Sequence, residues 1–170
     1  MKNYIARFEK VSFEQFTADY RNLITNDIDE KELREVYDNI QLPKRATKGS
    51  AGYDFVSTVS VTLKPGESIR IPTGIRCYME QGYVLHIYPR SSLGMKFQMT
   101  LTNTVGIIDS DYYNAKNEGH MITSIVNRGN KDFTLNAGER FTQGVFLPYF
   151  LAQEEDIETE REGGFGSSGK

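Results

Sequence analysis

From Ala51 onward, glycine and proline divide the chain into short runs that are rich in β-branched and aromatic residues. The run Val59–Leu63 stops before Pro65-Gly66, and the run Tyr83–Tyr88 stops before Pro89. Short strands at this spacing predict an all-β sandwich or barrel. Several runs are apolar at nearly every position, which indicates that both faces are covered, by a second sheet or by a neighbouring subunit. Further strands are expected at Ser68–Ile71, Met99–Thr102, Met121–Val126, Phe133–Leu135 and Gly144–Phe150.

The start of the chain has a different pattern, which predicts a strand at Tyr4–Val11 and then two amphipathic helices. Ser12, followed three residues later by glutamine, is typical of a capping box, and Asp29 with Glu32 opens the second helix in the same way. Pro43 ends that helix. We expect both apolar stripes to pack against the β domain, with binding of a partner protein as the alternative.

The 170 residues are enough for one domain with its own core. A single cysteine, Cys77, allows no intramolecular disulfide, and no apolar leader stretch is present, so we expect a soluble protein of a reducing compartment, the cytoplasm. No run is long enough for a membrane span.

A net charge of −3 argues against a nucleic-acid partner. His86 and His120 lack partners at metal-ligand spacing, which argues against a histidine-based zinc site.

The last ten residues, Arg161–Lys170, place one aromatic ring, Phe165, among glycines. Such a ring can swing onto a planar base, while Gly166, Ser167 and Ser168 offer donors to an anion. Arg161 adds a guanidinium that matches phosphate oxygens. The tail therefore predicts a nucleotide lid, although a solvated terminus would show the same composition. We expect a β-barrel domain over residues 1–152, with a helical insertion at about 12–41, and an acidic linker with a glycine-rich arm over 153–170.

Two carboxylates, Asp109 and Asp111, follow the apolar run that ends at Ile108. One of them could be a general base for a water, since partial burial raises carboxylate basicity. The pair could instead hold a divalent metal, or the segment could be a turn that ends a hairpin.

Arg90, Ser91 and Ser92 come directly after an apolar strand and could form a phosphate cradle. The alternative is the start of a helix capped by serine.

Five segments in order resemble the five motifs of the homotrimeric dUTP diphosphatases, of bacterial or phage type. The match covers about three-quarters of the chain, and five ordered motifs are far more specific than any one of them. The segments are Ala51–Phe55, Pro89–Gly94, Val105–Tyr112, Gly138–Gln143 and Arg161–Gly169.

The resemblance implies a jelly-roll-like β-barrel of the β-clip type, a mobile C-terminal arm and a homotrimer whose sites are shared between subunits. It implies an enzyme that splits dUTP into dUMP and pyrophosphate with Mg²⁺. Asp109 would deprotonate the water that attacks the α-phosphorus, and Tyr112 would pack against the deoxyribose. Asn103 and the hairpin backbone around Gly106 would read the uracil edge.

The resemblance also assigns the remaining positions of the site. Phe165 would stack on the uracil, and Arg161 would bind the γ-phosphate. Asp54 would at most contact a water on the metal, which the triphosphate itself is expected to hold. The other phosphate contacts would come from Arg90, Ser91, Ser92, Gln143, Gly166, Ser167 and Ser168.

Three departures from the family pattern stand out. Asn114 occupies a position that is usually glycine, and we expect it to adopt a left-handed conformation there. The segment Ala115–His120 looks like a lengthening after the hairpin, and Ser12–Gln41 exceeds a minimal member. Two alternatives follow: the related dCTP deaminase branch, and a nucleotide-responsive module that binds a regulatory protein through its N-terminal segment.

Overall fold

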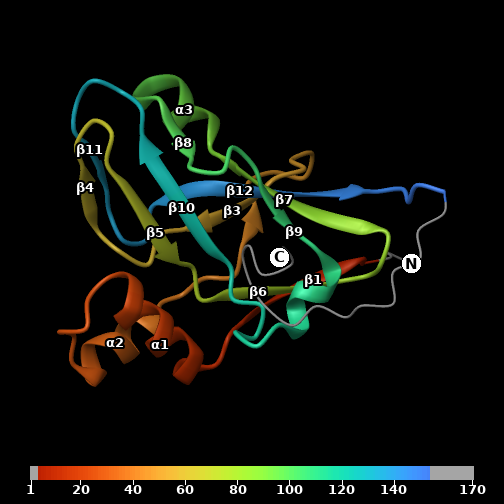
Figure 1. Ribbon diagram of the computed structural model, residues 1–170, viewed down its shortest axis with the longest axis horizontal. Coiled ribbons are helices and arrows are strands. Elements are labelled where there is room, and N and C mark those ends of the chain that lie inside the picture. The colour runs from red at the N-terminus through yellow and green to blue at the C-terminus, as the bar shows by residue number, and fades with distance from the viewer. Residues whose placement is uncertain (1–3, 154–170) are drawn as a thin grey trace.

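The computed structural model describes residues 4–153, and within them the predicted β architecture is confirmed as a set of open antiparallel sheets (Figure 1). The largest sheet has the strand order β2-β3-β12-β7-β9, beside a sheet β5-β10-β8 and two pairs, β1-β6 and β11-β4. No sheet within residues 4–153 closes into a barrel. The strands are β1 Ala6–Lys10, β2 Lys44–Arg45, β3 Tyr53–Val56, β4 Val61–Leu63, β5 Ser68–Pro72, β6 Ile75–Met79, β7 Tyr83–Pro89, β8 Met99–Leu101, β9 Gly106–Ile108, β10 Ile122–Asn127, β11 Phe133–Leu135 and β12 Arg140–Pro148.

Strand β12 is the central strand of the large sheet, because it pairs with β7 on one side and with β3 on the other. Its centre needs a glycine: a Cβ at Gly144 would lie 2.8 Å from Leu85 Cδ1 and 3.1 Å from Phe55 Cε2. Leu85, Phe55 and Phe141 are all buried in the core. Close packing of these large side chains therefore fixes where β3, β7 and β12 meet.

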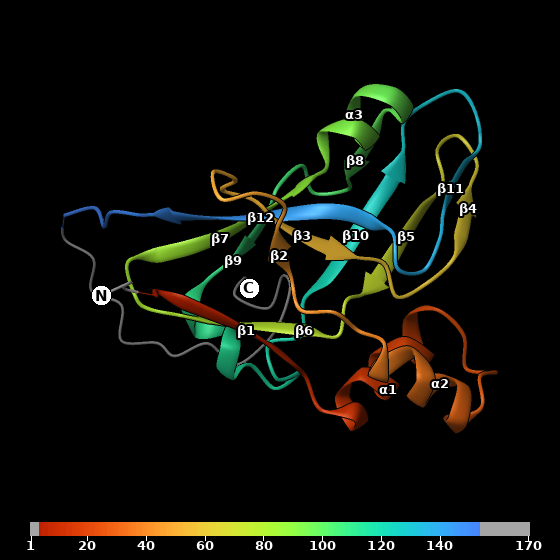
Figure 2. The same cartoon turned by 180° about the vertical axis from the view of Figure 1, so that it is seen from behind.

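Residues 4–153 also contain three helices, α1 Phe13–Leu23, α2 Glu30–Asp38 and α3 Ser91–Phe97, and a 3₁₀ turn η1 at Ser110–Asn114. Helix α1 contacts β5, and in both views α1 and α2 lie together at one end of the molecule (Figures 1 and 2). Phe16 and Leu33 are fully buried on the inner faces of α1 and α2. The prediction that the stripes pack against the β domain is confirmed for α1, which contacts β5, whereas α2 packs on α1.

Each of the first two helices begins at the predicted cap. The Ser12 hydroxyl accepts from the Gln15 N–H at 3.1 Å, and the Asp29 carboxylate accepts from the Glu32 N–H at 2.8 Å. The capping box of α1 is completed from elsewhere: the Ser12 N–H and hydroxyl donate to Glu118 at 2.8 and 2.6 Å. A carboxylate far along the chain thus satisfies the N–H that a local side chain often takes.

Strands β2, β3, β6 and β9 were absent from the strand list drawn from sequence, and β12 begins at Arg140, four residues before its predicted start at Gly144. In addition, Asn114 does not adopt the expected left-handed conformation. Glu118 and Gly119 have the positive φ values, 58° and 71°. The lengthened loop moves the left-handed residues to its far end. None of the described helices is long and apolar enough to span a membrane.

Candidate active site

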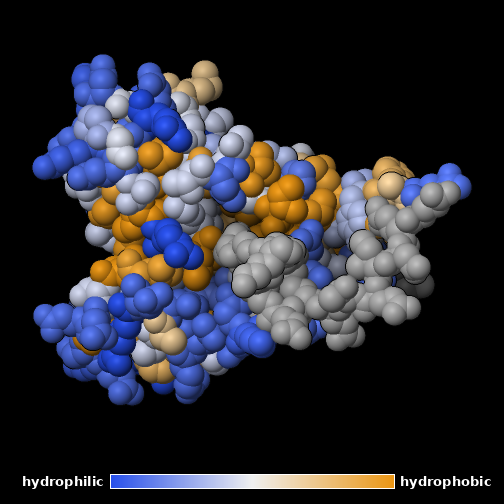
Figure 3. All heavy atoms as spheres, in the orientation of Figure 1, coloured by the Kyte–Doolittle hydropathy of each residue, from blue (hydrophilic) through white to orange (hydrophobic). Residues whose placement is uncertain are grey.

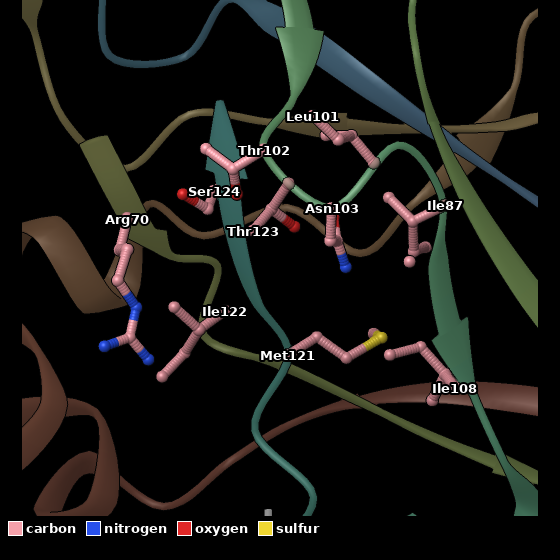
Figure 4. A pocket seen from close by; sticks show the side chains of 11 residues that line it. Arg70, Ile87, Leu101, Thr102, Asn103, Ile108, Met121, Ile122, Thr123 and Ser124 are labelled. Carbon is pink, nitrogen blue, oxygen red and sulfur yellow. The ribbon is translucent and has the colours of Figure 1, made fainter. Parts of the chain in front are cut away.

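A cavity of about 270 Å³ lies between strand β10 and the turn that connects β8 to β9 (Figure 4). Two predicted site residues, Asn103 and Gly106, line it, and the Asn103 side chain points into the space beside Met121. A Cβ at Gly106 would lie 3.0 Å from Ile87 Cβ, so a larger residue here would crowd the contact between β9 and β7. The full lining is Arg70, Ile87, Leu101, Thr102, Asn103, Gly106, Ile108, Met121, Ile122, Thr123 and Ser124.

The turn between β8 and β9 exposes polar groups beside the apolar walls of the cavity. The Val105 N–H donates to the Asn103 carbonyl at 2.7 Å, and Thr104 takes a positive φ of 70°. The Asn103 amide, which is exposed, offers both a donor and an acceptor. Apolar walls with a few placed polar groups are typical of a site for a flat organic ligand. The cavity can therefore hold a nucleobase and present hydrogen-bonding groups to its edge.

Asp109 follows β9 directly and forms the N-cap position of η1, so it stands one residue from the cavity-lining Ile108. Its side chain is half-buried, whereas Asp111 is exposed. Tyr112 is buried within η1, and its hydroxyl donates to the His120 carbonyl at 2.8 Å. The cavity lining includes neither Asp109 nor Tyr112, and both lie on the continuation of the strand that forms its wall.

A second group of predicted residues gathers at the other end of β7. The Asp54 carboxylate bridges two guanidinium groups, with Oδ1 3.2 Å from Arg90 Nε and Oδ2 3.0 Å from Arg140 Nη1. Gln143 pairs with Asp54 in the sheet register, and its amide lies 3.4 Å from the Pro89 carbonyl. Asp54 therefore holds two cations side by side, an arrangement suited to phosphate oxygens.

Arg140 belongs to this cluster, although the sequence alone assigned it no function. No local signal could have found it, because its partner Asp54 is 86 residues away. Ser91 and Ser92 are the first two residues of helix α3, so a helix does start here, but its N-cap residue is Arg90 and no serine caps it. Ser91 is exposed and Ser92 half-exposed, which leaves both hydroxyls near Arg90.

The two groups stand apart in one chain. Ile108 pairs with Leu85, which places Asp109 at the level of Val84, whereas Arg90 follows the last residue of β7. Six residues of extended strand, at about 3.3 Å each, separate them by about 20 Å. Arg90 and Arg140 line a different cavity, of about 450 Å³, which shares no residue with the first.

The donor set of the described residues does not form a metal cage: among residues 4–153 no three His, Cys, Asp or Glu side chains cluster. Asp54 already accepts from two arginines. Burial raises the pKa of the Cys77 thiol to about 12, so this cysteine is not a nucleophile. The predicted arm residues Arg161, Phe165, Gly166, Ser167 and Ser168 lie outside the described residues.

Solved structures define the class of this fold. A dUTPase from Streptococcus mutans is 41% identical, covers 77% of this chain and 96% of that chain, and has a TM-score of 0.60. A Staphylococcus bacteriophage 80alpha dUTPase, solved with dUpNHpp, is 21% identical over 99% of this chain and 100% of that chain, with a TM-score of 0.65. The fold is the β-clip jelly roll of these proteins, and the phage likeness extends over the N-terminal helices.

Sequence comparison identifies the family. The dUTPase family model matches residues 38–169. The deoxyuridine 5′-triphosphate nucleotidohydrolase of Lactococcus lactis subsp. lactis is 47% identical over 133 residues, which are 76% of this chain and 89% of that protein. The corresponding protein of Aeromonas salmonicida is 44% identical over 137 residues, 76% of this chain and 87% of that protein. The chain belongs to the dUTPase family of enzymes and is similar to its bacterial members.

Proposed function

We propose that this protein hydrolyses dUTP to dUMP and pyrophosphate. The family of the chain supports this activity. The observation that carries it is the position of Asp109, a half-buried carboxylate one residue beyond the wall of a cavity that can take a nucleobase. A general base at Asp109 would lie beside the place where the first phosphate of a bound nucleotide leaves the cavity.

In the proposed reaction, Asp109 accepts a proton from a water as the water oxygen bonds to the α-phosphorus. The bond from that phosphorus to the α,β-bridging oxygen breaks, and pyrophosphate leaves with the electron pair. Asn103 and the backbone around Gly106 pair with the uracil edge, and a cytosine would leave these polar groups mispaired. Tyr112 packs against the deoxyribose, where a 2′-hydroxyl would clash.

Phosphate binding is assigned to the cluster around Asp54. Arg90 and Gln143, with the hydroxyls of Ser91 and Ser92, contact the phosphate chain. We further propose a domain of residues 1–152 and an arm of residues 153–170. In that arm Phe165 stacks on the uracil, Arg161 binds the γ-phosphate, and Gly166, Ser167 and Ser168 bind phosphate oxygens.

The proposed cofactor is Mg²⁺, which suits this donor set because Mg²⁺ keeps several waters and binds phosphate oxygens. The triphosphate would hold it, with Asp54 near a metal-bound water at most. When bound, the ion neutralises phosphate charge. A phage phi11 dUTPase is described with a structural Mg(II) ion, and its likeness to this chain, at 19% identity, is one of fold.

We propose a homotrimer with sites shared between subunits. Asp109 and Arg90 are about 20 Å apart along β7, too far for one triphosphate to reach both in the same chain. Large apolar side chains are also exposed at the end of β12 and on β9, including Phe150 at 92% and Ile107 at 54%. An apolar band crosses the middle of one face between polar ends (Figure 3). A second subunit would cover such surfaces and supply the missing half of the site.

The test compares Asp109→Asn with the matched control Asp111→Asn, each incubated with every dNTP while pyrophosphate is measured. Wild-type protein should turn over dUTP far faster than dCTP or dTTP. Asp109→Asn should keep dUTP binding and lose hydrolysis by at least about 10²-fold, the usual scale for loss of a general base. Release of ammonia from dCTP, or full activity in Asp109→Asn, would overturn the assignment.

A regulatory partner on the N-terminal segment is a second proposal. The outer face of α2 is exposed and carries charges of both signs, among them Lys31 and Glu35. Removal of residues 12–41 cannot test it, since Phe16 and Leu33 are core residues. A pull-down with a Lys31→Glu and Glu35→Lys double variant is the suitable experiment. A cytoplasmic location is proposed on the single, buried cysteine Cys77.

A further inference from the structure

His120 is a fully buried histidine that joins three parts of the fold. Its Nδ1 lies 2.6 Å from Asp19 Oδ2 on helix α1. Its Nε2 accepts from the N–H of Gly74, in the turn between β5 and β6, at 2.8 Å. The Phe16 ring packs against the imidazole, with centroids 6.1 Å apart. The sequence suggested no partner for this residue.

These contacts fix the tautomer of the ring. A backbone N–H only donates, so Nε2 of His120 must present its lone pair to Gly74. The ring proton is therefore on Nδ1 and is donated to the Asp19 carboxylate. Gln15 Nε2 donates to the same Asp19 oxygen at 2.8 Å and orients it. Helix α1 thus holds the imidazole in a single orientation.

The backbone of His120 contacts η1, the turn that follows Asp109, on its other side. Its carbonyl accepts from the Tyr112 hydroxyl at 2.8 Å, and that hydroxyl accepts from Asn117 Nδ2 at 2.9 Å. The next residue, Met121, lines the cavity, and its N–H donates to the Ile75 carbonyl at 2.9 Å. His120 therefore connects Tyr112, the residue expected beside the sugar, with the cavity wall at Met121.

A second set of hydrogen bonds joins the same loop to the start of helix α1. Glu118, in the same lengthened loop, accepts two hydrogen bonds from Ser12 at the start of α1. Two segments exceed a minimal family member, the Ala115–His120 loop and the N-terminal helices. The loop bonds to helix α1 through Glu118 and again through His120. Neither segment is an independent appendage.

We propose that Asp19 and His120 are positioning residues that set the place of Tyr112, so that helix α1 contributes to the choice of a deoxyribose over a ribose. This inference rests on the proposed function, in which Tyr112 contacts the sugar. Asp19 touches no substrate. It acts through the orientation of His120, the His120 carbonyl and the Tyr112 hydroxyl.

The experiment measures kcat and KM of Asp19→Ala for dUTP and for UTP. We expect the preference for dUTP over UTP, as a ratio of kcat/KM values, to fall about ten-fold, because a displaced ring loses a sub-ångström fit. The change should appear mainly in KM for dUTP, since the sugar contact is made in both ground and transition states. Asp19→Asn should keep the wild-type preference for dUTP, because its amide oxygen can still accept from His120 Nδ1–H.

Two further variants make the result decisive. Glu14→Ala removes an exposed carboxylate from the same helix and should leave the ratio unchanged. Gln15→Ala removes only the amide that orients Asp19 and should lower the ratio about two-fold; it decides the matter if Asp19→Ala does not fold.

An unchanged ratio in a folded, less stable Asp19→Ala protein would reduce the Asp19–His120 pair to a structural contact and overturn the inference. Absence of dUTP turnover in the wild-type protein would instead refute the proposed function, and this inference with it.

Discussion

The turn glycine Gly74 offers a direct test of how the N-terminal helices attach to the β domain. It has a φ of 72°, and its N–H donates to His120. A Cβ at this position would overlap Ile40 Cδ1 and lie 3.4 Å from Phe16 Cδ2. Ile40 and Phe16 both belong to the helical segment and are buried. The Gly74→Ala variant therefore adds one methyl group to the junction.

Two costs are expected from that methyl group. The left-handed backbone is unfavourable for alanine by about 1–2 kcal/mol. Overpacking costs about 1–3 kcal/mol, and we take the lower end because Ile40 Cδ1 can turn aside. Gly74→Ala should thus lower the free energy of unfolding by about 2–3 kcal/mol. The control Gly82→Ala shares the positive φ, 88°, but has no atom within 4 Å, so only the first cost applies.

Urea unfolding at one protein concentration measures both variants, since the stability of an oligomer depends on concentration. Ile40→Val, which removes the clashing methyl, completes a double-mutant cycle with Gly74→Ala. We expect a favourable coupling of about 1 kcal/mol between the two changes. Equal losses in Gly74→Ala and Gly82→Ala, with strictly additive effects in the cycle, would show that the helices do not rest on this turn.

Two other outcomes are expected. Deleting residues 163–170 should leave the oligomer intact in sedimentation yet lower kcat/KM at least about five-fold, the lower limit for loss of one stacked base; monomers in that experiment would make the arm a structural element. Burial raises the pKa of Glu118, but two hydrogen bonds from Ser12 outweigh it and the net pKa is lowered. Its stabilisation is therefore present above the unfolded-state pKa of 4.5 and lost as pH falls through the lower folded value. Melting temperatures from pH 7 to pH 3 should fall less steeply in Glu118→Gln, and an identical slope would contradict this.

Local signals were sufficient to predict the parts of the fold that depend on near neighbours. The caps at Ser12 and Asp29 are such parts, since each side chain bonds an N–H three residues on. Strands bounded by proline and glycine were found for the same reason. Strands β2, β3, β6 and β9 were missed. The pairing of β3 with β12 and of β6 with β1 is set by tertiary contacts and not by a strong local pattern, and β2 and β9 have only two and three residues.

In the candidate site, too, features set by near neighbours could be predicted and features set by tertiary contacts could not. The position of Asp109 after an apolar run could be read from sequence, but the strand that this run forms, β9, was not predicted. The bridge from Asp54 to Arg90 and Arg140 could not, because it depends on the register of three strands. The tie from Glu118 to Ser12, across 106 residues, left no sequence pattern either.

The turn between β8 and β9 holds Asn103, and Asp109 follows β9, so two proposed site residues depend on the position of a short edge strand. β9 has three residues, lies at the edge of the large sheet and pairs there with β7 alone among the described strands. Arginines can adjust to a phosphate, but a general base must stand within hydrogen-bond reach of one water. A short edge strand offers few bonds to secure such a position. The contacts beyond β9 therefore have to supply the rigidity: Tyr113 bonds Glu9 of β1 at 2.6 Å, and Tyr112 is held through His120. If Asp109 is the general base as proposed, the contacts of helix α1 with the loop after η1 help to fix the segment that carries it.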